Sequence, residues 1–179
     1  MSLFSSSANV VPLTLDGVDL AVDDLAGLVR GHLVDVRAVY ASRERGAGAI
    51  VNISSTHGRQ PSAVNVDYGA AKAAMINLTK ALSEEFGPQG VRVNGVCPGP
   101  VKTPWWTDEG GALDILAAQV GADRGEVLST VAPEMMRLTT GCLGDPQEIA
   151  DAVVLLASPR SASTTGTEVV VDAGLLKTT

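Results

Sequence analysis

The sequence predicts an α/β protein built on a parallel sheet, and three observations carry this prediction. Short runs rich in valine and isoleucine, bounded by glycine or polar residues, recur along the chain and are typical of buried strands. Longer segments with apolar residues at helical spacing separate these runs. The resulting order is strand, helix, strand, helix, strand, helices, strand, and such alternation indicates parallel pairing through right-handed crossovers.

The first half of the chain contains two helical segments around a strand. Residues 1–14 begin with a short apolar run and then serines, which predicts a brief strand and a loop. Apolar residues recur at helical spacing over residues 23–45, where charge and glycine end the helix. The run AIVNIS at 49–54 predicts a buried strand. A helix follows at 66–86, and the stretch GPQG stops it.

The second half alternates in the same way. Residues 91–96, VRVNGV, predict a strand, and we expect residues 97–104, CPGPVKTP, to form a turn because three prolines cannot continue a ladder. Residues 105–140 predict one or two helices in a mobile excursion, with GG and GADRGE as breaks. Asp145 then supplies an N-cap, followed by proline at N1 and glutamate at N3. A strand within TEVVVDAG closes the chain.

The composition suits one soluble domain over residues 1–179. Hydrophobic residues make up 45% of the chain, which is enough for a sizeable core. The formal net charge of −7 argues against a nucleic-acid or anionic-membrane surface. Since no apolar run is long enough to span a bilayer and no signal-peptide pattern opens the chain, we expect a cytoplasmic protein.

The cysteines and histidines do not predict a metal site. Cys97 and Cys142 lie far apart without a CxxC context, which favours small buried hydrophobic residues. Two cysteines and two scattered histidines do not readily complete the four ligands of a zinc site. We therefore expect no metal.

The segment ISSTHGRQPSAVNVDYGAAK, residues 53–72, contains the candidate catalytic set Ser55, Tyr68 and Lys72. Tyr68 and Lys72 are four apart on a predicted helix, so they share a face. An ammonium beside a phenol lowers the pKa of tyrosine from its ordinary value of about 10. Ser55 and the CPGP stretch each follow a strand, at the rim where parallel sheets bind ligands. Together these side chains predict a proton-transfer site for an alcohol or a carbonyl.

Four stretches, in this order along the chain, are similar to the short-chain dehydrogenase/reductase family. They are IVNISS, YGAAKAAMINLTKALSEEFGPQGVRVNGVCPGPVKTP, GDPQEIADAVVLLASP and TGTEVVVDAG, and the resemblance covers roughly residues 48–176 and extends more weakly from residue 9. It implies a Rossmann-like doubly wound parallel sheet. It also implies reversible hydride transfer between NAD or NADP and a secondary alcohol or ketone.

The same resemblance implies roles for individual residues. Tyr68 is expected to be the general acid/base, Lys72 to lower its pKa and bind the nicotinamide ribose, and Ser55 to orient the substrate oxygen. Residues that border the nicotinamide are expected at Pro98, Gly99, Val101 and Thr103. The stretch 105–140 is expected to be a substrate lid that carries Trp105 and Trp106. Helices 23–45 and 66–86 resemble those of the family's dimer interface, so we expect a homodimer or homotetramer.

The sequence departs from the family pattern near its start. The glycine-rich turn G-x-x-x-G-x-G is absent, and Gly46 and Gly48 precede a strand rather than a helix. The family's catalytic asparagine is expected near Gly27 or Leu28, and neither is an amide. We expect an N-terminally truncated fold, with strands equivalent to the family's fourth to seventh, so the choice between NAD and NADP cannot be read from this sequence.

Three alternatives stay open. The chain could be a catalytically silent scaffold, subunit or chain fragment that keeps the fold and has lost cofactor binding. It could instead be a cofactor-independent isomerase or dehydratase that uses Tyr68 and Lys72. His57, two residues after Ser55, also raises a hydrolase hypothesis, but there is no G-x-S-x-G motif and no evident acidic partner.

Overall fold

The computed structural model describes residues 12–15, 18–21, 47–63 and 65–177 of the chain. The helix expected at 23–45 and most of the opening segment lie outside these residues. Two short strands, β1 (Pro12–Leu15) and β2 (Val18–Ala21), pair antiparallel as a hairpin. The sequence of this segment predicted a brief strand and a loop but not a hairpin.

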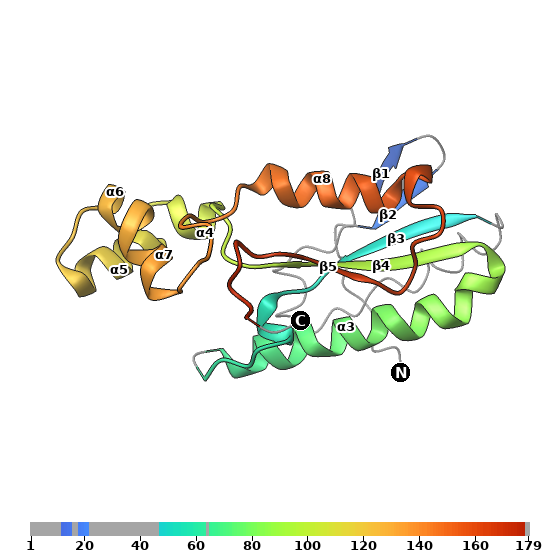
Figure 1. Cartoon of the computed structure of the whole chain (residues 1–179), viewed down its shortest axis with the longest axis horizontal. Coiled ribbons are helices and arrows are strands. Elements are labelled where there is room, and N and C mark those ends of the chain that lie inside the picture. Colours follow the sequence, from blue (N-terminus) through green and yellow to red (C-terminus); the bar gives the residue numbers. More distant parts are fainter. Residues whose placement is uncertain (1–11, 16–17, 22–46, 64, 178–179) are drawn as a thin grey trace, which may run out of the picture.

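The predicted parallel sheet is confirmed in the described part of the chain. Its strands are β3 (Gly48–Ile53), β4 (Val91–Pro98) and β5 (Glu168–Val171), hydrogen-bonded in the order β3-β4-β5 and all parallel. Helix α3 (Val66–Phe86) covers one face of this sheet and helix α8 (Pro146–Ala157) covers the other (Figure 1). The architecture is therefore a helix–sheet–helix sandwich.

Side-chain alternation along the strands produces two separate cores. Val51, Ile53 and Val96 face α8 and pack with Val153, Leu156 and Ala157. The alternate residues face α3, where Ile50, Val91 and Val93 pack with Leu82 and Phe86. Each core uses aliphatic residues almost alone, as the low aromatic content requires.

The boundaries of both long helices follow from local sequence. Helix α8 begins with a capping box in which Asp145 accepts from the backbone and Glu148 accepts from the N-cap N–H, with Pro146 at the first position. Helix α3 has the predicted bounds and leads through a 3₁₀ turn (Gly87–Gln89) to Gly90, whose φ of 82° turns the chain into β4. A further 3₁₀ turn (Pro159–Ser161) follows α8.

Strand β4 is longer than predicted, and the expectation of a turn from residue 97 onward is wrong for its first two residues. Cys97 and Pro98 pair with Val170 and Val171 of β5. The backbone N–H groups of Gly95 and Gly99 donate toward β5, so the ring nitrogen of Pro98 points to the opposite side. Pairing with β3 has already ended there at Val96, and the missing N–H therefore costs no ladder bond.

A cluster of short helices lies beyond the carboxyl ends of the strands (Figure 1). It contains α4 (Pro104–Thr107), α5 (Ala112–Val120), α6 (Arg124–Glu126), a π-helical segment (Val127–Val131) and α7 (Ala132–Met135). Positive φ angles at Gly110 and Gly121 mark the two predicted breaks. The cluster has its own core, built around Leu113, Leu116, Val127, Ala132, Leu138 and Leu143.

Candidate active site

Ser55 stands where β3 leaves the sheet. The backbone N–H of Ser54 still donates to the carbonyl of Val96, 2.8 Å away, and Ser55 then adopts an extended conformation with φ −166°. Its Oγ accepts from the backbone N–H of His57 at 3.2 Å and caps the 3₁₀ turn Thr56–Gly58. This bond uses one lone pair of the hydroxyl, so the Ser55 proton can be donated to the phenol oxygen of Tyr68 or to a substrate oxygen that takes its place.

Helix α3 brings Tyr68 and Lys72 to the same place. Lys72 is completely buried, and its Nζ donates to the carbonyl of Ile53 at 2.8 Å, one residue before the serines. The ammonium lies over the Tyr68 ring, 5.6 Å from its centroid. Ser55 hydrogen-bonds the Tyr68 side chain. The three residues predicted from spacing therefore meet at the carboxyl edge of the sheet.

Two glycines allow the loop after β3 to contact α3 closely. A Cβ on Gly58 would lie 2.8 Å from the carbonyl carbon of Lys72 and 2.9 Å from the nitrogen of Ala73. A Cβ on Gly69 would lie 3.2 Å from the carbonyl oxygen of His57. This close approach holds the Ser55 turn against the helix that carries Tyr68.

The pKa of Tyr68 differs from the sequence expectation in direction. Burial raises the pKa of Tyr68 above its ordinary value, and the hydrogen bond with Ser55 acts in the opposite sense without outweighing burial. In the chain without bound ligand the net direction is therefore upward, and the lowering by Lys72 stays a prediction for the ligand-bound site. Tyr68 is a neutral phenol at pH 7 and is ready to donate a proton.

His57 and Asn65 complete the surroundings of Tyr68. The His57 and Tyr68 rings meet edge to face, with centroids 5.8 Å apart and planes at 90°. Nδ1 of His57 and Nδ2 of Asn65 are 3.1 Å apart and hydrogen-bonded. Burial lowers the pKa of His57, so its ring is neutral at pH 7. From the sequence, His57 was a candidate only for a hydrolase, and no pattern pointed to Asn65.

A buried polar group next to the site was also missed. The Ser54 hydroxyl hydrogen-bonds Oε2 of Glu168 at 2.7 Å and the carbonyl of Val96 at 3.1 Å. Burial raises the pKa of Glu168 and raises the pKa of Cys97 to about 11. Ser54 and Glu168 are 114 residues apart, and no local sequence pattern predicts such a contact.

The residues expected to border the nicotinamide follow β4 at the same edge. Gly99 is required by packing, because a Cβ there would lie 2.7 Å from the Cα of Asp172. Val101 forms an isolated parallel bridge with Gly144. Thr103 is the N-cap residue of α4, and its carbonyl accepts from the N–H of Trp106 at 2.8 Å. Pro98, at the end of β4, is half-buried.

The two tryptophans of the predicted lid have different surroundings. Trp106 packs against the core of the helical cluster, whereas Trp105 is 68% exposed. Their rings meet edge to face with centroids 5.3 Å apart. Contact of either ring with a substrate stays a prediction. None of the described helices is long and apolar enough to cross a bilayer, and the described residues include no cluster of three or more metal-ligating side chains.

Comparison with known proteins gives a family match over nearly the whole chain. A family model described as enoyl-(acyl carrier protein) reductase matches residues 7–176. The 2-keto-3-deoxy-L-fuconate dehydrogenase of Xanthomonas campestris is 40% identical over 132 residues, which cover 73% of this chain and 41% of that protein. The chain thus spans about half the length of the curated relatives it matches.

Solved structures agree with this match. The L-sorbose reductase of Gluconobacter frateurii, determined with NADPH and L-sorbose, superposes with a TM-score of 0.72 at 32% identity and covers 80% of this chain and 53% of its own. An NADPH-bound short-chain oxidoreductase of Pseudomonas aeruginosa, described as containing an atypical catalytic center, gives a TM-score of 0.68 at 33% identity. That superposition covers 82% of this chain and 53% of the other.

Proposed function

This chain belongs to the short-chain dehydrogenase/reductase family, and from that premise we propose that Ser55, Tyr68 and Lys72 form the proton-transfer site of an NAD(P)-linked oxidoreductase. Its substrate would be a secondary alcohol or a ketone. The observation that carries the proposal is the fully buried Lys72, held by the Ile53 carbonyl and lying over the ring of Tyr68. A fully buried lysine is rare unless it has a function or a partner.

The residues divide the proton chemistry between them. A bound nicotinamide supplies or accepts the hydride at the reacting carbon. In the reductive direction the neutral Tyr68 donates its proton to the substrate oxygen, and in the oxidative direction its phenolate takes that proton back. The Ser55 hydroxyl accepts from the His57 N–H through one lone pair and donates its proton to the same substrate oxygen. Lys72 brings positive charge to the site, which stabilises the phenolate.

The chemistry of the described residues fits the nicotinamide half of the cofactor. Lys72 offers a buried cationic donor for ribose hydroxyls, and we propose that Pro98, Gly99, Val101 and Thr103 border the nicotinamide. The described residues contain no glycine-rich turn between a strand and a helix that would hold the pyrophosphate. The choice between NAD and NADP therefore stays open in this proposal.

Titration of the purified chain, at verified intact mass, with NADH and NADPH tests the cofactor part of the proposal. Calorimetry should give a dissociation constant in the micromolar range for at least one nucleotide, and the Lys72→Ala variant should weaken it. No binding up to millimolar nucleotide would overturn the proposal and favour the silent scaffold. Turnover of a substrate without nicotinamide would instead favour a cofactor-independent isomerase or dehydratase.

The proposal also includes the sequence expectations on assembly and location. We propose a cytoplasmic homodimer or homotetramer that acts on a small molecule, with residues 105–140 as the substrate lid. Light scattering tests the assembly, because a single species at the chain mass of 18.4 kDa would contradict it.

A further inference from the structure

We propose that His57 is a specificity-determining residue, whose imidazole Nε2–H donates a hydrogen bond to a second oxygen of the substrate, close to the reacting carbon. The substrate class would then be hydroxy-substituted ketones and their diols rather than plain aliphatic ketones. This inference rests on the proposed function and adds a substrate class to it.

The position of His57 is the first support. The backbone N–H of His57 donates to the Oγ of Ser55, and the imidazole ring meets the ring of Tyr68 at 5.8 Å between centroids. A substrate oxygen that lies between Ser55 and Tyr68 is therefore next to the imidazole. A group on a neighbouring carbon of that substrate comes within reach of the ring.

The hydrogen bond with Asn65 is the second support. Asn65 occupies the N-cap position of α3, where asparagine usually bonds the backbone, but its side chain makes no cap bond. Its Nδ2 instead meets Nδ1 of His57 at 3.1 Å. With the amide in this orientation its NH₂ can only donate, so Nδ1 accepts and the neutral ring carries its proton on Nε2. No other described residue hydrogen-bonds the imidazole, so Nε2–H is available to a ligand.

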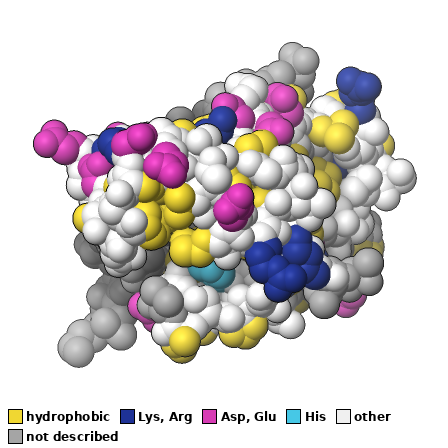
Figure 2. Space-filling view, turned by 60° about the vertical axis from the view of Figure 1, so that its left-hand side comes forward, with side chains coloured by type: hydrophobic (Ala, Val, Ile, Leu, Met, Phe, Trp, Pro, Cys, Tyr) yellow, Lys and Arg dark blue, Asp and Glu magenta, His cyan; other side chains and the backbone are white. Residues whose placement is uncertain are grey.

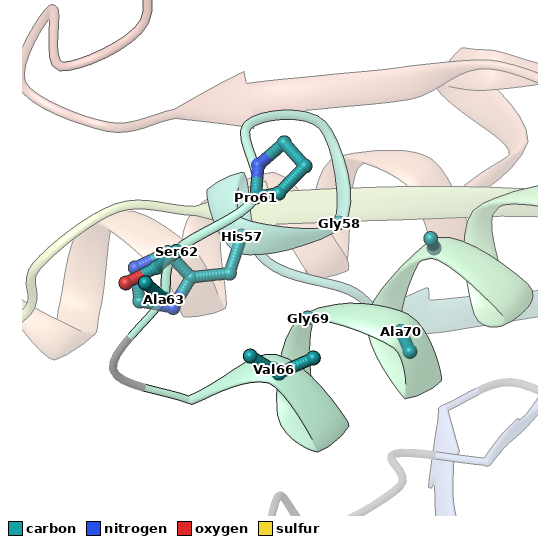
Figure 3. A pocket seen from close by; sticks show the side chains of 9 residues that line it. His57, Gly58, Pro61, Ser62, Ala63, Val66, Gly69 and Ala70 are labelled. Atoms are coloured by element: carbon teal, nitrogen blue, oxygen red, sulfur yellow. The ribbon is translucent and has the colours of Figure 1, made fainter.

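His57 also borders a cavity that is separate from the catalytic set, since neither Ser55 nor Tyr68 lines it. This cavity of about 370 Å³ lies between the loop of His57 and the start of α3. Figure 3 shows the His57 side chain close to Ser62 and Ala63, above Val66 at the first turn of the helix. Apart from Ser62 and His57, the cavity is lined by proline, alanine, valine and glycine. Figure 2 shows a small patch of histidine atoms reaching the surface next to a cluster of basic side chains.

The test compares two ketones that differ in one hydroxyl, 1-hydroxy-2-butanone and 2-butanone, with the nicotinamide that binds. One hydrogen bond predicts that the wild-type chain prefers the hydroxyketone by about tenfold in kcat/KM. His57→Phe keeps an aromatic ring against Tyr68. This variant should abolish the preference by lowering kcat/KM for the hydroxyketone and not for 2-butanone. His57→Gln keeps a donor near Nε2 and should restore much of it. An unchanged preference in His57→Phe, or an equal loss for both ketones, would overturn the inference.

Absence of turnover in the wild-type chain would count against the proposed function and not against this inference. A second measurement tests the inference in that case. The chain has two histidines, so a ¹⁵N spectrum of the ring nitrogens can be assigned with His57→Phe. The Nε2 signal of His57 should shift on addition of 1-hydroxy-2-butanone and stay in place with 2-butanone. A signal that responds to neither ketone, or to both alike, would overturn the inference.

The same spectrum tests the role of Asn65, which acts through His57 and is a positioning residue. The ring of the free wild-type chain should show a protonated Nε2. Asn65→Ala should give a mixture of both tautomers and reduce the preference for the hydroxyketone about threefold, since a lone imidazole divides its proton between the two nitrogens. A ring protonated on Nδ1 in the wild type would mean that Asn65 accepts through its oxygen, and the proposal would be wrong.

Discussion

Replacing Gly95 by alanine should destabilise the chain only while Glu168 is present. Gly95 lies in β4 directly beside Glu168 of β5, and the Glu168 carboxylate lies across it. A Cβ on Gly95 would stand 1.7 Å from Oε1 and 2.6 Å from Cδ of Glu168. The carboxylate must therefore move, and its 2.7 Å hydrogen bond with Ser54 is lost.

The magnitude follows from that bond. A hydrogen bond to a charged group contributes about 1.5–3 kcal/mol. Alanine in a strand recovers about 0.5–1 kcal/mol relative to glycine, so Gly95→Ala alone should cost about 1–2 kcal/mol. In a Glu168→Ala background the same change should stabilise the chain by about 0.5–1 kcal/mol. The coupling free energy is the difference, about 2 kcal/mol, or roughly 4–8 °C in Tm for a chain of this size.

Urea unfolding of the wild type, both single variants and the double variant gives this coupling free energy directly. Gly87→Ala serves as a matched control, because a Cβ on Gly87 meets nothing within 4 Å. An equal cost of Gly95→Ala with and without Glu168 would refute the account of this contact.

Three further predictions follow from single residues. Ala173 has a φ of 57°, so Ala173→Gly should raise the free energy of unfolding by about 1 kcal/mol in urea denaturation, and a loss would contradict the strain. Burial raises the pKa of Glu168, so the charged form of this side chain opposes folding at pH 7. Glu168→Gln should therefore raise Tm at pH 7 and hardly change Tm at pH 4. A larger gain in Tm at pH 4 than at pH 7 would contradict this account. Burial raises the pKa of Tyr68 in the chain without ligand, so an absorbance titration compared with Tyr68→Phe should place this phenol above the ordinary pKa of tyrosine, and ionisation below that value would contradict the burial account.

Local signals predicted the elements that carry the site. Helix α3 has the predicted bounds because its apolar spacing ends at a glycine-proline stop, and α8 begins where the capping box indicated. Ser55, Tyr68 and Lys72 meet as expected, because a strand end and one helix face fix all three.

The features that the sequence could not predict depend on contacts between distant segments. Strand β4 continues through Pro98 because β3 has already ended beside it. The direction of the Tyr68 pKa depends on how deeply the phenol is buried, which four-residue spacing does not report. The pairs His57–Asn65 and Ser54–Glu168 need a folded loop and a third strand, respectively.

The most direct test of the central claim is the rate of NADH and NADPH consumption by the purified chain with a panel of ketones, compared between the wild type and Tyr68→Phe. Tyr40→Phe changes the other tyrosine and serves as the control. Loss of a general acid predicts a decrease in kcat of about 100-fold or more for Tyr68→Phe and little change for Tyr40→Phe. Equal rates in Tyr68→Phe and the wild type would contradict the assignment of Tyr68 as the proton donor.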